Sequence, residues 1–227
     1  VIEYPSANAD FGADFENLAL FADGTFHLGS SWRAIAGLRW TEDELSFDHT
    51  YNYSKIPGPG IRNRASGGSD FLYGRNESDN VSGRAGVQFD VTEDFMTYAT
   101  YSRGYKGPAY NVFFNMTANN AAVIDEETAD SYELGFKSTL FDSRMILNGA
   151  IFSATYDNFQ ANNFLFLNGT LITTLTNAGE VSTEGFELDF LAKPLDNFTL
   201  SGGIAYTDAQ VDKYFTPPGQ TPQIESG

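Results

Sequence analysis

Residues 81–90 read VSGRAGVQFD, with small or apolar side chains at every second position and mostly polar side chains between them. An alternation of period two is the pattern of a β-strand, because successive side chains of a strand point to opposite faces. Residues 198–207, which read FTLSGGIAYT, repeat it. The pattern returns along nearly the whole chain, whereas helical periodicity is weak throughout. The sequence therefore predicts an all-β protein made of antiparallel strands.

Eight strands joined in four hairpins are predicted from this alternation. They are expected at residues 15–26, 31–41, 80–90, 95–105, 128–139, 144–160, 171–192 and 198–211. Tight turns rich in Asp, Ser, Gly and Pro are expected near residues 27–30, 90–94, 140–143 and 193–197. Longer connections at residues 42–79, 106–127 and 162–170 alternate with these turns. Such an alternation is typical of a membrane β-barrel, which has short periplasmic turns and long extracellular loops.

The spacing of aromatic residues indicates a membrane as well. Trp32 and Trp40 share one face and are separated by eight positions, as are Phe198 and Tyr206. Eight residues of a strand span about 26 Å, which is close to the apolar band of about 25 Å in outer-membrane barrels. We therefore predict that these four rings lie at the two membrane interfaces, although aromatic residues are common in any strand.

Composition excludes several classes of protein. Among 227 residues, 13 Lys and Arg stand against 30 Asp and Glu, which gives a formal net charge of −17 and argues against a nucleic-acid partner. Cysteine is absent, so disulfide frameworks and thiol chemistry are excluded. No run approaches the roughly 20 apolar residues of a transmembrane helix, but the alternating strands of a barrel need no such run.

The predicted topology places both ends of the chain at the end that carries the long loops. A complete small barrel usually keeps both termini in the periplasm. We therefore expect one barrel domain over residues 1–227 that supplies about eight consecutive strands of a larger wall. A complete eight-stranded adhesion barrel is the less favoured interpretation.

Several segments resemble one known family. Residues 98–111 read YATYSRGYKGPAYN, and residues 127–160 and 177–190 follow with a strand, turn, strand unit and the run NAGEVSTEGFELDF. Residues 17–41 are similar to an earlier hairpin of the same barrels. Together these segments resemble the C-terminal β-barrel of TonB-dependent outer-membrane receptors, and the resemblance covers residues 17–210.

The resemblance implies a transmembrane β-barrel of the bacterial outer membrane that imports a scarce nutrient, with a ferric siderophore or similar chelate as the expected ligand. It implies a plug domain inside the barrel and energy from a TonB-type protein that acts through an N-terminal segment. Plug, coupling box and last strands are expected outside this chain. Lipid bilayer and lipopolysaccharide are the other implied partners, and no enzymatic activity, cofactor or metal is implied.

Candidate ligand or plug contacts lie where a strand meets a long loop. Arg103 and Lys106 could bind the plug or an anionic chelate, or could anchor the barrel rim. Tyr110, Phe113 and Phe114 follow in the loop and could stack on a flat ligand, or could pack within the loop. Six polar residues are predicted to alternate onto the luminal face, where they would meet plug and water. They are Arg84, Gln88, Glu133, Lys137, Glu187 and Asp189.

Other functions have weaker support in the sequence. The only histidines, His27 and His49, have no spacing typical of a catalytic triad or a metal site. The acidic runs at residues 42–44 and 125–127 could bind calcium but fit solvated rims better. A soluble secreted β-sandwich that binds carbohydrate through Tyr110 and Phe114 is the alternative from a different class.

Overall fold

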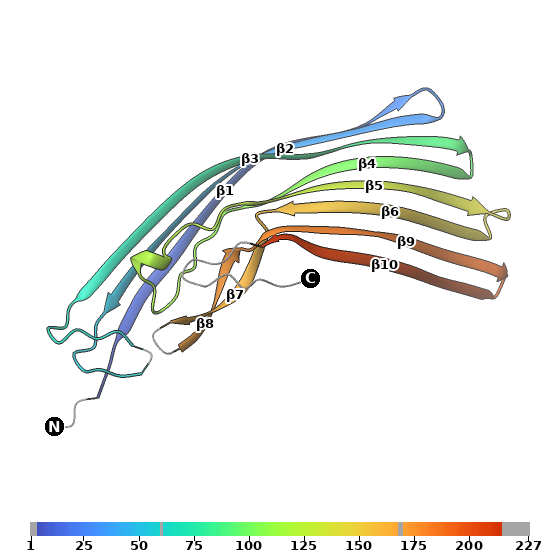
Figure 1. Ribbon diagram of the computed structural model, residues 1–227. Helices are drawn as coiled ribbons and strands as arrows, with labels where there is room; N and C mark the ends of the chain where they lie inside the picture. Colours follow the sequence, from blue (N-terminus) through green and yellow to red (C-terminus); the bar gives the residue numbers. More distant parts are fainter. Residues whose placement is uncertain (1–3, 60, 168–169, 215–227) are drawn as a thin grey trace.

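The structure, a computed structural model, describes residues 4–59, 61–167 and 170–214 and consists of a bent antiparallel sheet with a small hairpin beneath it (Figure 1). The strands of the sheet, in spatial order, are β1 (Asn8–Leu28), β2 (Trp32–Asn52), β3 (Ser69–Thr92), β4 (Phe95–Lys106), β5 (Glu127–Leu140), β6 (Met145–Asp157), β9 (Gly179–Leu195) and β10 (Phe198–Tyr214). The hairpin consists of β7 (Gln160–Leu167) and β8 (Thr170–Asn177). One short 3-10 helix, η1 (Ala118–Asn120), lies between β4 and β5. None of the described helical segments could span a membrane.

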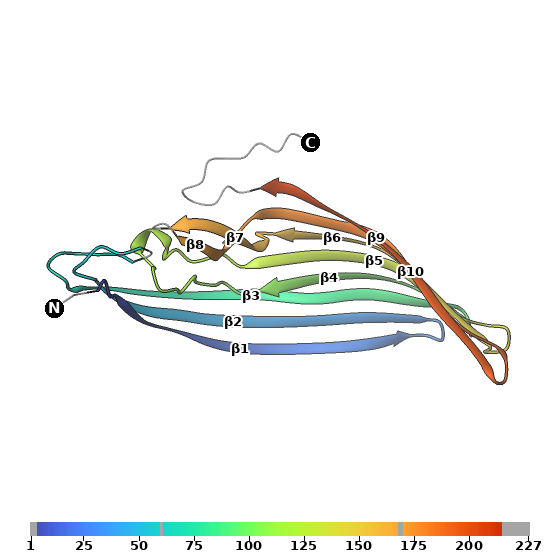
Figure 2. The same ribbon diagram turned by 90° about the horizontal axis from the view of Figure 1, so that it is seen from below.

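The connections of the sheet are separated by length, as predicted. The four tight turns, at residues 29–31, 93–94, 141–144 and 196–197, all lie at one end of the sheet (Figures 1 and 2). We call this the tight-turn end. The opposite end, the long-connection end, holds the β2–β3 loop, the β4–β5 loop and the β7–β8 hairpin. The all-β antiparallel fold and the eight-stranded sheet are therefore confirmed.

Several predicted boundaries were wrong at the long-connection end, where β1 starts at Asn8 rather than at residue 15 and β6 ends at Asp157 rather than at residue 160. Residues 42–79 were expected to be a loop, but β2 continues to Asn52 and β3 starts at Ser69, so only residues 53–68 connect them. The strand was predicted to end at the charged run of residues 42–44, but the alternation of its side chains continues through that run. The single strand expected at residues 171–192 is divided between β8 and β9, and the connection expected at residues 162–170 is largely the β7–β8 hairpin; residues 168 and 169 lie outside the described residues.

The register assigns each side chain to one of two faces, because paired residues of neighbouring strands point to the same side. Trp32 pairs with Leu28 on β1 and with Phe89 on β3, whose ring stacks on it at a centroid distance of 4.3 Å. Trp40 lies on the same face, and so do Tyr206 and its partner Phe186. We call this the outward face. The inner face is the opposite one, toward which the β4–β5 loop and the β7–β8 hairpin fold (Figure 1).

The outward face is apolar and uncovered. Leu20, Leu38 and Ile204 are 74%, 63% and 60% exposed, and the predicted interface residues Trp32, Trp40, Phe198 and Tyr206 are all at least 36% exposed. A contiguous apolar surface of this kind is rare on soluble proteins. The described strands form one sheet with an additional hairpin, and no second sheet stacks on the outward face. The described strands therefore give no support to a soluble sandwich, which would bury such residues between two sheets.

Gly179 lies where the chain passes from the β7–β8 hairpin into β9 of the large sheet. Its φ of 130° is a conformation that side chains rarely adopt, and an added Cβ would collide with the backbone carbonyl of Lys213 on β10.

We expect Gly179→Ala to lower the free energy of unfolding by about 2 kcal/mol or more, since strain and collision act together. Urea unfolding of the full-length barrel would measure the change. Gly12→Ala is the matched control, because its Cβ would meet nothing closer than 3.5 Å. Equal stability of the two variants would contradict the proposed role of Gly179.

Candidate functional site: the inner face and its loops

Bidentate ion pairs connect strands across the inner face. Arg84 on β3 donates through Nε and Nη2 to Asp23 on β1, at 2.8 and 2.7 Å. Nearer the tight-turn end, Arg33 donates through two nitrogens to Asp90, each at 2.6 Å, and through Nε to Gln88 at 2.9 Å. Forked guanidinium contacts of this kind hold side chains in a defined orientation. Arg84 and Gln88 therefore both lie on the inner face.

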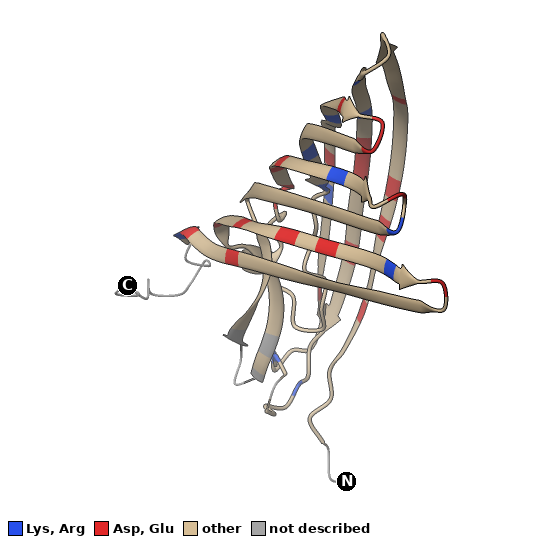
Figure 3. Ribbon diagram, turned by 90° about the vertical axis from the view of Figure 1, so that its right-hand side faces the viewer, with Lys and Arg blue, Asp and Glu red and all other residues tan. Residues whose placement is uncertain are grey.

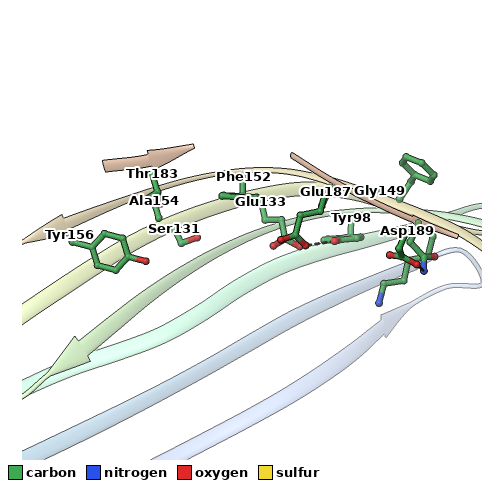
Figure 4. A pocket seen from close by; sticks show the side chains of 14 residues that line it. Tyr98, Ser131, Glu133, Gly149, Phe152, Ala154, Tyr156, Thr183, Glu187 and Asp189 are labelled. Atoms are coloured by element: carbon green, nitrogen blue, oxygen red, sulfur yellow. Dashed lines mark hydrogen bonds between the residues drawn. The ribbon is translucent and has the colours of Figure 1, made fainter. Parts of the chain in front are cut away.

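The four other predicted luminal residues border one open hollow on the inner face of β4, β5, β6 and β9. The hollow has a volume of about 470 Å³, and Glu133, Lys137, Glu187 and Asp189 line it. Tyr98 donates its hydroxyl to Glu133 at 2.6 Å, and Asn148 donates to Asp189 at 3.0 Å. Figure 4 shows Glu133, Glu187 and Tyr98 converging on this hollow.

The hollow carries an excess of negative charge. Three carboxylates face one ammonium group, that of Lys137, which lies 6.0 Å from the centre of the Tyr98 ring. None of the Lys and Arg residues described by the structure forms an ion pair with Glu133, Glu187 or Asp189. Acidic bands on β9 are visible in Figure 3. Among the residues that the structure describes, no group of three His, Cys, Asp or Glu side chains could hold a metal ion. The excess of carboxylates in the hollow suits contact with a cationic or hydrogen-bond-donating surface.

Beyond Trp40, the inner face of β2 becomes a binding surface for the β4–β5 loop. Phe47 and Tyr51 are 2% and 0% exposed because loop rings cover them. Tyr110 meets Phe47 edge to face at a centroid distance of 4.7 Å, and Phe114 lies 5.3 Å from Tyr51. Between them, His49 contacts the loop backbone: its Nε2 lies 3.0 and 3.3 Å from the carbonyl oxygens of Phe113 and Phe114. The ring is fully buried, and a proton on Nε2 satisfies both carbonyls.

Tyr110 and Phe114 therefore pack against the inner face of β2, whereas the sequence analysis considered stacking on a ligand or packing within the loop. Tyr110, Phe113 and Phe114 are all partly buried. Burial also raises the pKa of the Tyr110 hydroxyl. The rings of Tyr110 and Phe114 therefore hold the loop against β2.

Arg103 and Lys106 lie apart from the hollow. Arg103 pairs in register with Gly83, on the outward face, where Nη1 donates to Asp130 at 2.8 Å. Lys106 is half exposed at the end of β4, with its Nζ 3.8 Å from a carboxylate oxygen of Glu127.

Several contact residues at the long-connection end were not found from the sequence. Asp43 belongs to the acidic run that was expected to form a solvated rim, but it is 2% exposed and accepts hydrogen bonds from Asn17 at 2.5 Å and from Tyr105 at 2.7 Å. Arg62 stacks on Tyr51, with its guanidinium carbon 3.9 Å from the ring centre. The alternation of residues 41–51 carries a signal for this surface, because Leu45, Phe47 and Tyr51 share a face opposite to that of Trp40.

Comparison with known proteins agrees with this geometry. The family model described as "TonB dependent receptor-like, beta-barrel" matches residues 2–224. The probable TonB-dependent siderophore receptor PiuA of Acinetobacter baumannii is 26% identical over 212 residues, covering 91% of this chain and 26% of the relative. The pesticin receptor of Yersinia pestis is 26% identical over 77% of this chain and 23% of its own length. The chain thus spans about a quarter of the curated relatives it matches.

Solved structures show the same fold. The ferric yersiniabactin uptake receptor FyuA of Yersinia pestis superposes with a TM-score of 0.69 at 22% identity, over 92% of this chain and 29% of that one. The ferric-catecholate import receptor Fiu of E. coli, in its closed form, gives 0.68 at 18% identity, over 90% and 29% of the two chains. The chain belongs to the TonB dependent receptor-like β-barrel family, whose members are β-barrel proteins of the bacterial outer membrane.

Proposed function

We propose that the protein is an outer-membrane active-transport receptor that binds a scarce nutrient at the cell surface, with a ferric siderophore or a similar metal chelate as ligand. Import draws its energy from an inner-membrane TonB-type complex that acts on a plug inside the barrel. The observation that carries the proposal is the two-faced sheet: an apolar outward face bordered by aromatic rings, and a polar inner face beneath inward-folded loops. The relatives include receptors named for siderophores and for metal-pseudopaline, which supports a metal chelate as ligand.

The test is uptake of radioactive iron by cells that express the full-length receptor in a strain without its own gene. The probes are iron-loaded ferric catecholate and ferric yersiniabactin. We expect energy-dependent accumulation of at least one, which stops when a protonophore collapses the proton gradient. Uptake that persists without the gradient, or no uptake of any metal chelate, would contradict the proposal.

We propose that the acidic hollow is the surface that meets the plug, through basic or hydrogen-bond-donating groups of that domain. Glu133, Glu187 and Asp189 have no cationic partner among the described residues, and an inward-facing domain would supply one. A charge that becomes buried at such a contact destabilises the contact unless it is paired with an opposite charge or hydrogen-bonded.

Replacing Glu187 by Gln should loosen the plug, because a carboxylate accepts stronger hydrogen bonds from cations than an amide does. We expect severalfold greater sensitivity of cells to a bulky antibiotic that the intact outer membrane excludes. The control is Glu184→Gln, three residues away on β9 but on the outward face, where it pairs with Ser153. Equal sensitivity of the two variants would refute the plug contact.

The β4–β5 loop is proposed to border the route of the nutrient, held against the wall by His49. His49→Phe keeps an aromatic ring to stack on Phe11 but removes the donor to two loop carbonyls.

Loss of a hydrogen bond of about 1 kcal/mol should raise the open population of the loop about fivefold. Limited proteolysis of residues 107–126 on intact cells would measure this, with His27→Phe, an exposed histidine near a tight turn, as the control. An unchanged cleavage rate would show that His49 is not an anchor.

A further inference from the structure

Three separate connections meet at the long-connection end: the β2–β3 loop (residues 53–68), the β4–β5 loop (residues 107–126) and the β7–β8 hairpin. We call them together the outer cap. They are up to about a hundred residues apart in sequence, yet side chains of each contact the backbone of the next. These contacts raise the question of whether the three connections move separately or together.

The neck of the β4–β5 loop is closed twice. Ala109 and Ile124 exchange backbone hydrogen bonds at 3.0 and 2.8 Å. Gln160, the first residue of β7, then donates its amide nitrogen to the carbonyl of Gly107 and to that of Asp125, both at 2.9 Å. One side chain of the hairpin thus joins both arms of the loop. Gln160 is 6% exposed, so solvent has little access to replace these bonds.

Two further amide side chains connect the same pair of elements. Asn111 donates to the carbonyl of Leu175 at 2.7 Å and accepts from its N–H at 2.8 Å, as a residue of a neighbouring strand would. Asn177 accepts from the N–H of Asp125 at 2.8 Å and donates back to its carbonyl at 2.9 Å. Both donor and acceptor of each amide are used. Neutral groups make these contacts, so salt does not screen them as it screens exposed ion pairs.

Arg62 makes the corresponding connection on the other side. Its Nη2 donates to the carbonyl of Met116 at 2.9 Å, and Met116 is fully buried in the β4–β5 loop. The guanidinium also stacks on Tyr51, and the Arg62 N–H donates to the Tyr51 hydroxyl at 2.8 Å. The β2–β3 loop is therefore tied to the β4–β5 loop and to the wall at one point.

We propose that the outer cap is one interlocked unit with Gln160 as its clasp, so that displacement of the β7–β8 hairpin releases the β4–β5 loop and, through Met116 and Arg62, the β2–β3 loop. Opening at Gln160 leaves two carbonyls without their donors, which favours a cap that is either closed or open over one that opens by degrees. The role of this unit as a gate for the nutrient rests on the proposed function, whereas the coupling itself does not.

Hydrogen exchange measured by mass spectrometry on the detergent-extracted full-length receptor, without ligand, tests the coupling. Gln160→Leu should speed amide exchange about tenfold in residues 107–126 and also in residues 53–68, which Gln160 does not touch. The matched control is Gln210→Leu, since Gln210 is exposed and its amide donates only to Asp208. Unchanged mobility of the unboiled barrel on an SDS gel confirms that each variant is folded.

The reverse perturbation completes the test. Arg62→Leu should speed exchange in the β7–β8 hairpin, whereas Arg75→Leu, which removes an exposed arginine from the outward face of β3, should not. Faster exchange confined to the elements that each altered side chain touches would overturn the proposal. If exchange is coupled but no metal chelate is imported, the interlocked cap stands and the proposed function fails.

Discussion

On β1 and β2 the apolar side of the strand changes along the length of the strand, and the packing of the loops depends on that change. On β2, apolar side chains occupy the outward face from Trp32 to Trp40 and the inner face from Leu45 to Tyr51. The outward face of the half nearer the tight-turn end meets a medium that cannot solvate polar groups. The outward face of the half nearer the long-connection end meets water. β1 follows the same rule: Leu20 is outward, and Phe11 and Phe15 are inward.

Near the long-connection end, the apolar residues on the inner face of β2 must be shielded from water, and the outer cap shields them. Phe47, Tyr51 and Met116 are among the few fully buried apolar side chains of the described chain. Burying one such side chain contributes about 1.5–3 kcal/mol, more than a typical hydrogen bond. The apolar contacts therefore hold the β4–β5 loop inward, and the directional bonds of His49, Arg62 and Gln160 define how it sits.

Below the cap, the inner face is built for polar partners. Forked ion pairs such as Arg84 with Asp23 satisfy part of it within the sheet, while the hollow beside Glu133 and Glu187 keeps uncompensated acceptors. The two media that the sheet separates thus differ in dielectric and in hydrogen-bonding capacity, and the side chains of each face match their medium.

The sequence by itself determined what depends on local period. The common face of Trp32 and Trp40 and the opposite, inner side of Glu133 and Asp189 follow from alternation alone, because a strand has only two faces. The tight turns follow from the breaks between alternating runs. Tertiary structure decided the rest. The inward packing of Tyr110, the outward side of Arg103, and the joining of loop and hairpin by Gln160 depend on partners tens of residues away. No local pattern specifies such partners, since side-chain contacts between loops arise only after the strands that carry them are paired.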